Sequence, residues 1–303
     1  MSFKLNNEYI SLDIREPGEF YRGSRFDWTG QITQVTYLNK HTFCTAESLD
    51  QQLVNKQGCG LNNEFGIESP LGYDDCCSGG KFHKIGVGLL TRKSTEPYNF
   101  LEDYAGSPYP FSFKLKDESV KFYYKASPSG GYSFQFEKQI ALNENTFTIN
   151  YRLKNCGEKT IHTNEYVHNF LAINGRPVSK HYRLYFPFEI KSQRINKLVN
   201  PEEIVRISGN SVIWNSIPGK QFFLGKINTG YRGIGKWALI HLKEKIGIQE
   251  STNFNLQKIN LWGAAHVISP EIFFEINAAP GESVSWLRTY SLFSLNNILT
   301  NYR

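Results

Sequence analysis

The chain has 303 residues, of which 40% are hydrophobic and 20% are charged, so it holds enough apolar sequence to fold around a core. Its formal net charge is +6, and the 34 Lys and Arg residues form no run of five or six basic side chains. A nucleic-acid-binding surface normally concentrates its positive charge, so the sequence argues against a nucleic-acid partner. No segment approaches the ~20 apolar residues that a membrane-spanning helix requires, which argues against a membrane protein.

Cysteine usage and the N-terminal residues predict a cytoplasmic protein. The first residues contain no apolar stretch typical of an export signal, and the chain has five cysteines, an odd number. Cys76 and Cys77 are adjacent, and the nearest histidine, His83, stands alone. Zinc sites need paired Cys or His residues at short spacings, so we expect free thiols rather than a zinc site, and no metal or other cofactor.

Apolar and polar residues alternate through most of the chain, which predicts β-strands. The predicted strands cover residues 120–126, 132–137, 146–153, 182–188, 211–214, 221–226, 237–242 and 286–293. Asn143, Glu144 and Asn145 form a turn-like cluster, which predicts an antiparallel hairpin between the second and third of these strands. Residues 55–80 form the longest region without alternation and are predicted to be a functional loop. Pro201 stands where a short helix over residues 201–205 could begin.

Strands that recur every ~12 residues with short turns are typical of an antiparallel sandwich or barrel. No linker rich in Pro, Gly or Ser divides the chain, and no repeat of fixed period is present. The sequence therefore predicts an all-β fold, a large antiparallel β-sandwich, with residues 1–303 in a single domain.

The first candidate site residues lie in segment 164–170. As a strand, this segment places Asn164, Tyr166 and His168 on one face, and Glu165 and Asn169 on the other. Neither face is apolar, which is unusual inside a sandwich and indicates the lining of a pocket. His168 could act there as a general acid or base, or it could be a hydrogen-bonded structural histidine; both interpretations stay open.

Three other groups of polar residues are candidates. Arg22, Arg25 and Asp27 beside Trp28 could bind hydroxyls or an anion, or could pair with one another on the surface. His83 and Lys84 follow directly after the long predicted loop.

Two carboxylates, Glu271 and Glu275, lie in the apolar run 266–275. Such surroundings can raise the pKa of a carboxyl group, as a general base requires near neutral pH. Either residue could instead be an ordinary solvent-facing strand residue.

Four segments together resemble the galactose mutarotase-like (aldose 1-epimerase) superfamily. They are residues 23–30 (GSRFDWTG), 164–170 (NEYVHNF), 268–282 (ISPEIFFEINAAPGE) and 286–290 (WLRTY), and they occur in the expected order. The resemblance implies a large β-sandwich with a sugar-binding cleft on one sheet. It also implies interconversion of aldose anomers without a metal. A carboxylate takes the proton of the anomeric hydroxyl, and an imidazolium protonates the ring oxygen.

The resemblance implies roles for several residues of this chain. The acid falls on His168 and the base on Glu271, with Glu275 as the second choice. Lower-ranked candidates for substrate binding are Arg25, Glu64, His83 or Lys84, Asn164 and Tyr166. The chain lacks the Asn-Arg-Ile run and the His-Gly-Gly motif of the superfamily, so we expect a divergent member.

Three functions remain open at this point. The first is an isomerase, an aldose 1-epimerase acting on an aldose or modified sugar, with a carbohydrate as its partner. The second is a carbohydrate-binding protein that keeps the cleft without the chemistry. The third is a sugar-phosphate epimerase, suggested by the positive charges of Arg22, Arg25 and Lys84. The sequence predicts no particular oligomeric state.

Overall fold

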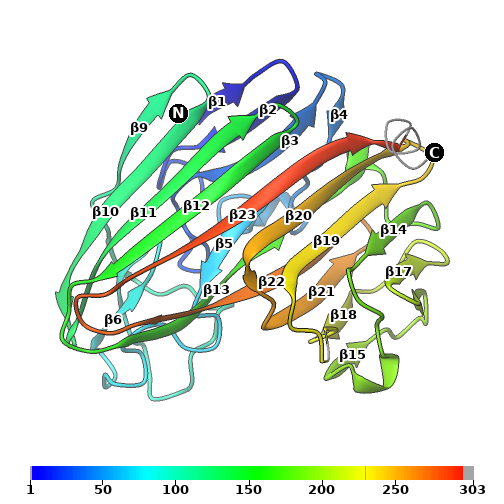
Figure 1. Ribbon diagram of the computed structural model, residues 1–303. Coiled ribbons are helices and arrows are strands. Elements are labelled where there is room, and N and C mark those ends of the chain that lie inside the picture. Colours follow the sequence, from blue (N-terminus) through cyan, green and yellow to red (C-terminus); the bar gives the residue numbers. More distant parts are fainter. Residues whose placement is uncertain (1, 229, 296–303) are drawn as a thin grey trace.

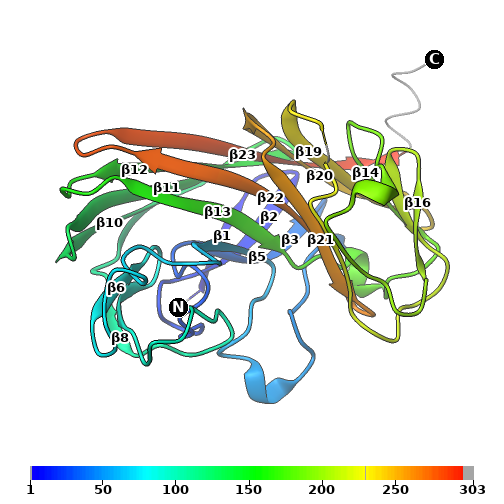
Figure 2. The ribbon, with the colours of Figure 1, turned by 90° about the horizontal axis from the view of Figure 1, so that it is seen from below.

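Two large antiparallel sheets face each other, and a small third sheet lies on the outer side of the first (Figures 1 and 2). The computed structural model describes residues 2–228 and 230–295. The predicted all-β class and large antiparallel sandwich are confirmed. Within the described ranges, no helix is long and apolar enough to cross a membrane.

The first sheet carries the candidate site. In spatial order it contains β1 (Ser2–Asn6), β2 (Ile10–Arg15), β3 (Gln31–Tyr37), β5 (Leu61–Phe65), β13 (Ile161–Asn169), β22 (Val267–Ala278), β21 (Lys258–Ala264), β18 (Phe222–Gly225) and β15 (Lys197–Val199). β4 (His41–Thr42) also pairs with β3.

The second sheet covers one face of the first. In spatial order it contains β16 (Val205–Ser208), β17 (Ser211–Trp214), β14 (Tyr182–Tyr185), β19 (Ile234–His241), β20 (Ile246–Asn255), β23 (Ser283–Ser294), β12 (Thr146–Asn155), β11 (Tyr132–Asn143), β10 (Ser119–Ser129) and β9 (Ser112–Lys116). The small sheet contains β6 (Lys81–Lys84), β7 (Gly88–Thr91) and β8 (Gly106–Pro108). Three short 3-10 helices are η1 (Gln51–Leu53), η2 (Ile173–Gly175) and η3 (Ser192–Arg194).

Aromatic side chains fill the space between the two large sheets. Phe65 of β5 meets the ring of Phe136 of β11 edge-on at 5.5 Å between centroids, and Trp286 of β23 at 6.4 Å. Within the second sheet, Tyr151 stacks on Trp286 at 4.8 Å. These contacts join the sheets into one apolar core behind the strands that carry the site.

The hairpin predicted around residues 143–145 is confirmed. β11 and β12 pair antiparallel with Asn143 opposite Thr146, so Glu144 and Asn145 make the turn. The strands on either side bury one face and expose parts of the other, which is the arrangement that alternation predicts.

The helix predicted over residues 201–205 is wrong. Residues 201–203 form a turn and bend, and Val205 begins β16, where it pairs with Trp214. Glu203 has a φ of +53°, which a right-handed helix does not allow. The Glu202 carboxylate accepts hydrogen bonds from the backbone N–H groups of Gly219 and Lys220 at 2.8 and 2.9 Å.

The prediction of a continuous loop over residues 55–80 is wrong for residues 61–65. β5 lies inside this range, and all five of its residues are buried between β3 and β13. Its three central residues, Asn62, Asn63 and Glu64, are polar. The strand was missed because its side chains serve polar networks on both faces, so no apolar alternation marks it.

Candidate active site

β13 places polar side chains on both faces of the first sheet. Tyr166 and His168 lie on the outer face, beside Glu64 and Glu271. Glu165 and Asn169 point the other way, into the space between the sheets, and contact Arg288 and Tyr290 of β23. The strand periodicity of segment 164–170 predicts this division.

His168 and Glu271 lie in direct contact on the outer face. The Nε2 atom of His168 is 3.3 Å from Oε1 of Glu271, and each side chain is only 6% exposed. On the other side of the ring, Nδ1 lies 2.6 Å from the hydroxyl oxygen of Ser269. The ring also stacks on Phe170 at 4.1 Å and meets the edge of Trp262 at 5.3 Å. These contacts hold the imidazole in one orientation, with Nε2 toward Glu271.

Burial sets the protonation of this pair. Desolvation raises the pKa of Glu271 to about 8, and it lowers the pKa of His168 well below its usual value of 6.5. Both shifts have the same cause, and both disfavour the charged form of the group. Transfer of a proton from the Glu271 carboxyl group to the His168 imidazole gives a carboxylate and an imidazolium, so the two side chains can exchange one proton between them.

A cluster of charged side chains lies next to this pair. Arg25 donates from Nε to Glu64 Oε2 and from Nη1 to Glu47 Oε1, both at 2.8 Å, and from Nη2 to the Tyr166 hydroxyl at 3.4 Å. The Tyr166 hydroxyl donates to Glu64 Oε2 at 2.6 Å. Tyr166 connects the cluster to the pair, because its ring centroid lies 5.9 Å from that of His168.

Lys84 completes the cluster from the small sheet. Its Nζ lies 3.6 Å from Oε1 of Glu64, and both side chains are fully buried. Desolvation lowers the pKa of Lys84 to about 8, and the neighbouring Glu64 opposes this shift. The structure thus brings together six predicted site residues: Arg25, Glu64, Lys84, Tyr166, His168 and Glu271.

Three other predicted residues lie apart from this group. His83 points away from Lys84, and its Nδ1 lies 2.8 Å from the Tyr109 hydroxyl. Asn164 and Glu275 are paired across β13 and β22, and Glu275 is exposed. Each is four residues along its strand from His168 or Glu271, a separation of about 13 Å. The geometry therefore favours Glu271 over Glu275 as the partner of His168.

Several residues of the site were not among the sequence candidates. Glu47 and Ser269 carry no motif of their own, and they reach Arg25 and His168 only through the fold. Trp262, whose ring is nearly perpendicular to the imidazole, lies on β21, beside β22 in the sheet. The one indication in the sequence was the alternation of side chains along β22, which places Ser269 on the same face as Glu271.

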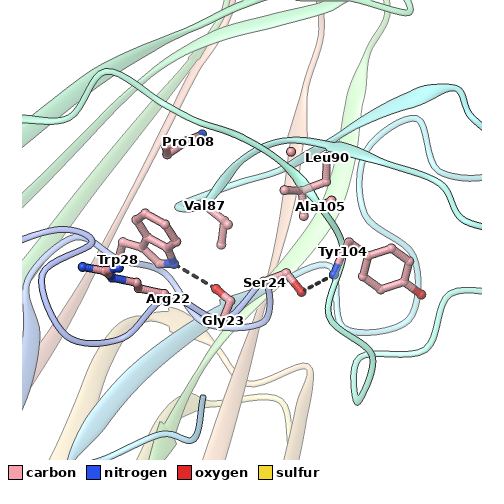
Figure 3. A pocket seen from close by; sticks show the side chains of 10 residues that line it. Arg22, Gly23, Ser24, Trp28, Val87, Leu90, Tyr104, Ala105 and Pro108 are labelled. Carbon is pink, nitrogen blue, oxygen red and sulfur yellow. Dashed lines mark hydrogen bonds between the residues drawn. The ribbon is translucent and has the colours of Figure 1, made fainter. Parts of the chain in front are cut away.

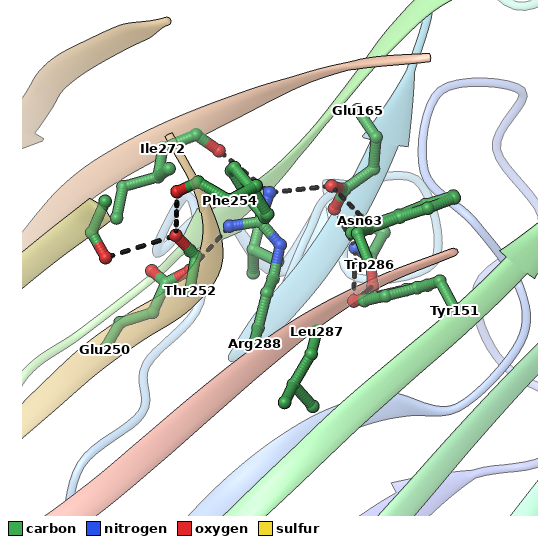
Figure 4. A network of polar contacts seen from close by, with 12 residues as sticks. Asn63, Tyr151, Glu165, Glu250, Thr252, Phe254, Ile272, Trp286, Leu287 and Arg288 are labelled. Atoms are coloured by element: carbon green, nitrogen blue, oxygen red, sulfur yellow. Dashed lines mark hydrogen bonds and ion pairs between the residues drawn. The ribbon is translucent and has the colours of Figure 1, made fainter. Parts of the chain in front are cut away.

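A buried polar network lies directly behind β13 (Figure 4). Arg288 donates to Glu165 at 2.6 Å and to Glu250 at 2.5 Å, and none of the three side chains is exposed. Asn63 of β5 donates to the second oxygen of Glu165 and to the Tyr151 hydroxyl. The network ties β5, β13 and β23 together across the two sheets.

A pocket of about 220 Å³ lies beside segment 22–28 (Figure 3). It is lined by Arg22, Gly23, Ser24, Trp28, Val87, Leu90, Tyr104, Ala105, Gly106 and Pro108. The Trp28 indole donates to the Gly23 carbonyl, and Ser24 accepts from the backbone of Tyr104. Neither His168 nor Glu271 reaches this pocket, so it is separate from the candidate active site.

The described residues contain no group of three or more His, Cys, Asp or Glu side chains that could hold a metal ion. All five cysteines are free.

Comparisons with known proteins identify the fold. No protein-family model matches the sequence, and no curated protein matches it either. Among solved structures, a galactose mutarotase related enzyme from Lactobacillus acidophilus matches with a TM-score of 0.61 at 13% identity, over 97% of this chain and 98% of the other. A galactose mutarotase-like protein from Lactobacillus casei matches with a TM-score of 0.58 at 12% identity, over 97% and 100%. An aldose epimerase homologue from C. elegans matches with a TM-score of 0.55 at 11% identity, over 98% and 100%. These likenesses confirm the galactose mutarotase-like fold that the sequence predicted.

Proposed function

We propose that this chain, which has the galactose mutarotase-like fold, binds an aldose and interconverts its α and β anomers by acid–base catalysis. In this proposal His168 and Glu271 transfer the protons. Glu64 and Lys84 bind a hydroxyl of the sugar, and Arg25 and Tyr166 hold the Glu64 carboxylate in place. A cytoplasmic location agrees with the five free cysteines.

The contact between His168 and Glu271 carries the proposal. Ring opening removes a proton from the anomeric hydroxyl and adds one to the ring oxygen, and both oxygens are bonded to the same carbon. The two groups that act on them must therefore lie close together and differ in protonation. The separation of 3.3 Å between His168 Nε2 and Glu271 Oε1 supports the first requirement, and the opposite charge preferences of an imidazole and a carboxyl group support the second.

The proton transfers balance without a cofactor. The deprotonated member of the pair accepts the proton of the anomeric hydroxyl, while the protonated member donates to the ring oxygen. The bond between the anomeric carbon and the ring oxygen breaks, and the open chain carries an aldehyde. Rotation about the bond next to that aldehyde and reversal of the transfers yield the other anomer. Burial supports these steps, because it brings the pKa of Glu271 to about 8, close to physiological pH.

The proposal is tested by the rate at which a freshly dissolved anomer equilibrates. Purified protein is added to α-glucose, α-galactose or α-xylose, and the approach to equilibrium is followed by polarimetry or by NMR exchange. We expect acceleration over buffer for at least one sugar. We expect His168→Asn and Glu271→Gln each to lower the rate by at least about a hundredfold, the usual scale of a general acid or base.

The same two strands offer matched controls. His162 lies on β13 and Glu275 on β22, and both are exposed. His162→Asn and Glu275→Gln should keep the wild-type rate if His168 and Glu271 are the reacting pair. Full activity in folded His168→Asn or Glu271→Gln would refute the assignment. Sugar binding without acceleration would identify a carbohydrate-binding protein instead.

A further inference from the structure

Three buried polar atoms in or beside the charged cluster make no hydrogen bond. Glu64 Oε1, Lys84 Nζ and the Tyr98 hydroxyl each lack a hydrogen-bond partner within residues 2–228 and 230–295. Lys84 Nζ stands 3.6 Å from Glu64 Oε1 and 5.0 Å from the centroid of the Tyr98 ring. Buried polar groups are normally hydrogen-bonded, so the Lys84–Glu64 ion pair, whose facing atoms are too far apart for a direct hydrogen bond, indicates a site for a polar ligand group.

The other polar atoms around Lys84 and Glu64 already have partners. Every nitrogen of the Arg25 guanidinium already donates to Glu64, Glu47 or Tyr166. The second oxygen of Glu64 accepts from both Arg25 and Tyr166. What remains is one cationic donor, Lys84 Nζ, beside one acceptor, Glu64 Oε1.

A hydroxyl group satisfies both remaining atoms at once. A hydroxyl oxygen accepts from the ammonium and its hydrogen is donated to the carboxylate. Two atoms 3.6 Å apart can both lie within hydrogen-bond distance of one such oxygen. A phosphate or a carboxylate of the ligand offers only acceptors, and it would meet Glu64 as a like charge.

The charge balance of the cluster also favours a neutral hydroxyl over an anionic ligand group. The cations Arg25 and Lys84 are matched by the carboxylates Glu47 and Glu64, so no positive charge is left over to bind an anion. Aromatic rings of the connection between β7 and β8 cover the two cations. Tyr98 lies over Lys84, and Phe100 lies over Arg25 at 4.5 Å.

We infer that Glu64, Lys84 and Tyr98 form a specificity-determining subsite that takes one hydroxyl of the sugar at the end remote from the anomeric carbon. The subsite selects sugars with a free hydroxyl there over analogues that carry hydrogen, phosphate or carboxylate at that position. This inference rests on the proposed function for the location of the anomeric carbon. It concerns which sugars bind, whereas the proposed function concerns what happens to them.

Binding measured by calorimetry or ligand-observed NMR tests the inference on the wild-type protein. The probes are glucose, galactose and xylose, their monodeoxy forms, glucose 6-phosphate and glucuronic acid. For the parent sugar that binds, we expect one deoxy form to lose about ten- to a hundredfold in affinity, the scale of a hydrogen bond to a charged group. We expect the phosphate and the uronic acid to bind at least about tenfold more weakly than glucose.

The variant Lys84→Met makes the test residue-specific. Methionine has a similar length, and Glu64 keeps Arg25 as its cation at 2.8 Å in this variant, so the fold should be retained. In this variant the sensitive deoxy sugar should bind as well as its parent, because the lost hydroxyl no longer has its cationic donor. Lys93 is an exposed lysine of the same connection, so Lys93→Met is the control. This variant should still bind the deoxy sugar more weakly than its parent sugar.

The outcomes separate the two proposals. Phosphorylated or acidic sugars that bind as tightly as glucose would overturn the subsite and leave an epimerase for charged sugars. If folded Lys84→Met still binds the deoxy sugar more weakly than its parent sugar, the subsite is overturned as well. If Lys84→Met does not fold, the wild-type panel alone decides. A wild-type protein that binds none of the probes would overturn the proposed function together with the subsite.

Discussion

Replacing Arg288 by methionine should destabilise the fold strongly. Arg288 is fully buried and lies between two buried carboxylates, with Glu165 at 2.6 Å and Glu250 at 2.5 Å. A third contact runs from its Nη2 to the carbonyl of Ile272 at 2.9 Å. Methionine preserves much of the volume but leaves both carboxylates without this cation. The cost therefore comes from uncompensated charge and not from a cavity.

The expected loss is about 3–5 kcal/mol, the cost of removing one member of a buried ion pair. An unfolding entropy of about 2 cal/mol/K per residue over 303 residues converts this to a fall of about 5–8 °C in Tm. The loss should shrink at lower pH. Arg288 lowers the pKa of Glu250, so its removal raises that pKa in the folded protein, and the folded variant binds more protons than the unfolded chain. The deficit is therefore larger at pH 8 and decreases as the pH falls toward about 5.

Thermal unfolding followed by circular dichroism at pH 8 and pH 5.5 measures both effects. Arg152→Met is the control, because Arg152 is exposed on β12, the neighbour of β23. It should change Tm by no more than about 1 °C. An Arg288→Met protein that melts with the wild type would refute the reasoning. So would a loss that is the same at both pH values.

Two further predictions concern the pair at the active site. Ser269→Ala should lower the anomer-exchange rate about tenfold and shift its pH profile, because His168 Nδ1 loses its partner at 2.6 Å. Ser269→Thr should restore part of the rate, and an unchanged profile in Ser269→Ala would exclude a positioning role for Ser269. The raised pKa of Glu271 means that the folded protein holds a proton that the unfolded chain has released. From pH 6.5 to 8, wild-type stability should therefore fall relative to Glu271→Gln by roughly 1 kcal/mol per pH unit, and His168, which both proteins contain, contributes equally to each. Parallel urea-unfolding curves over this range would contradict the burial of an ionising Glu271.

The fold could be predicted from the sequence wherever a strand buries one face only. β11 and β12 alternate apolar and polar side chains, because one face meets the core and the other is partly exposed. The turn at Glu144 and Asn145 has the composition of its class. Local sequence is sufficient in such segments.

The site could be predicted only in part, because several of its contacts join distant segments. His168 and Glu271 stood out as polar residues in apolar surroundings and through the superfamily resemblance. β5 was missed because both of its faces are polar, and Glu47 was missed because its partner is Arg25, 22 residues away. The proximity of Lys84 to Glu64 depends on how the small sheet packs on the first sheet, and no local pattern encodes that packing.

The two polar faces of β13 also fix how this strand aligns with its neighbours. A slip of one residue against β22 would exchange the faces, turning His168 toward Arg288 and Glu165 toward the outer surface. Arg288 would then lose one of its two anions inside the sandwich, at a cost of several kcal/mol. Strand register is usually enforced by an apolar stripe, which β13 lacks. Here the ion pairs enforce it, so the polar residues of β13 that face the core also keep its histidine on the correct side of the sheet.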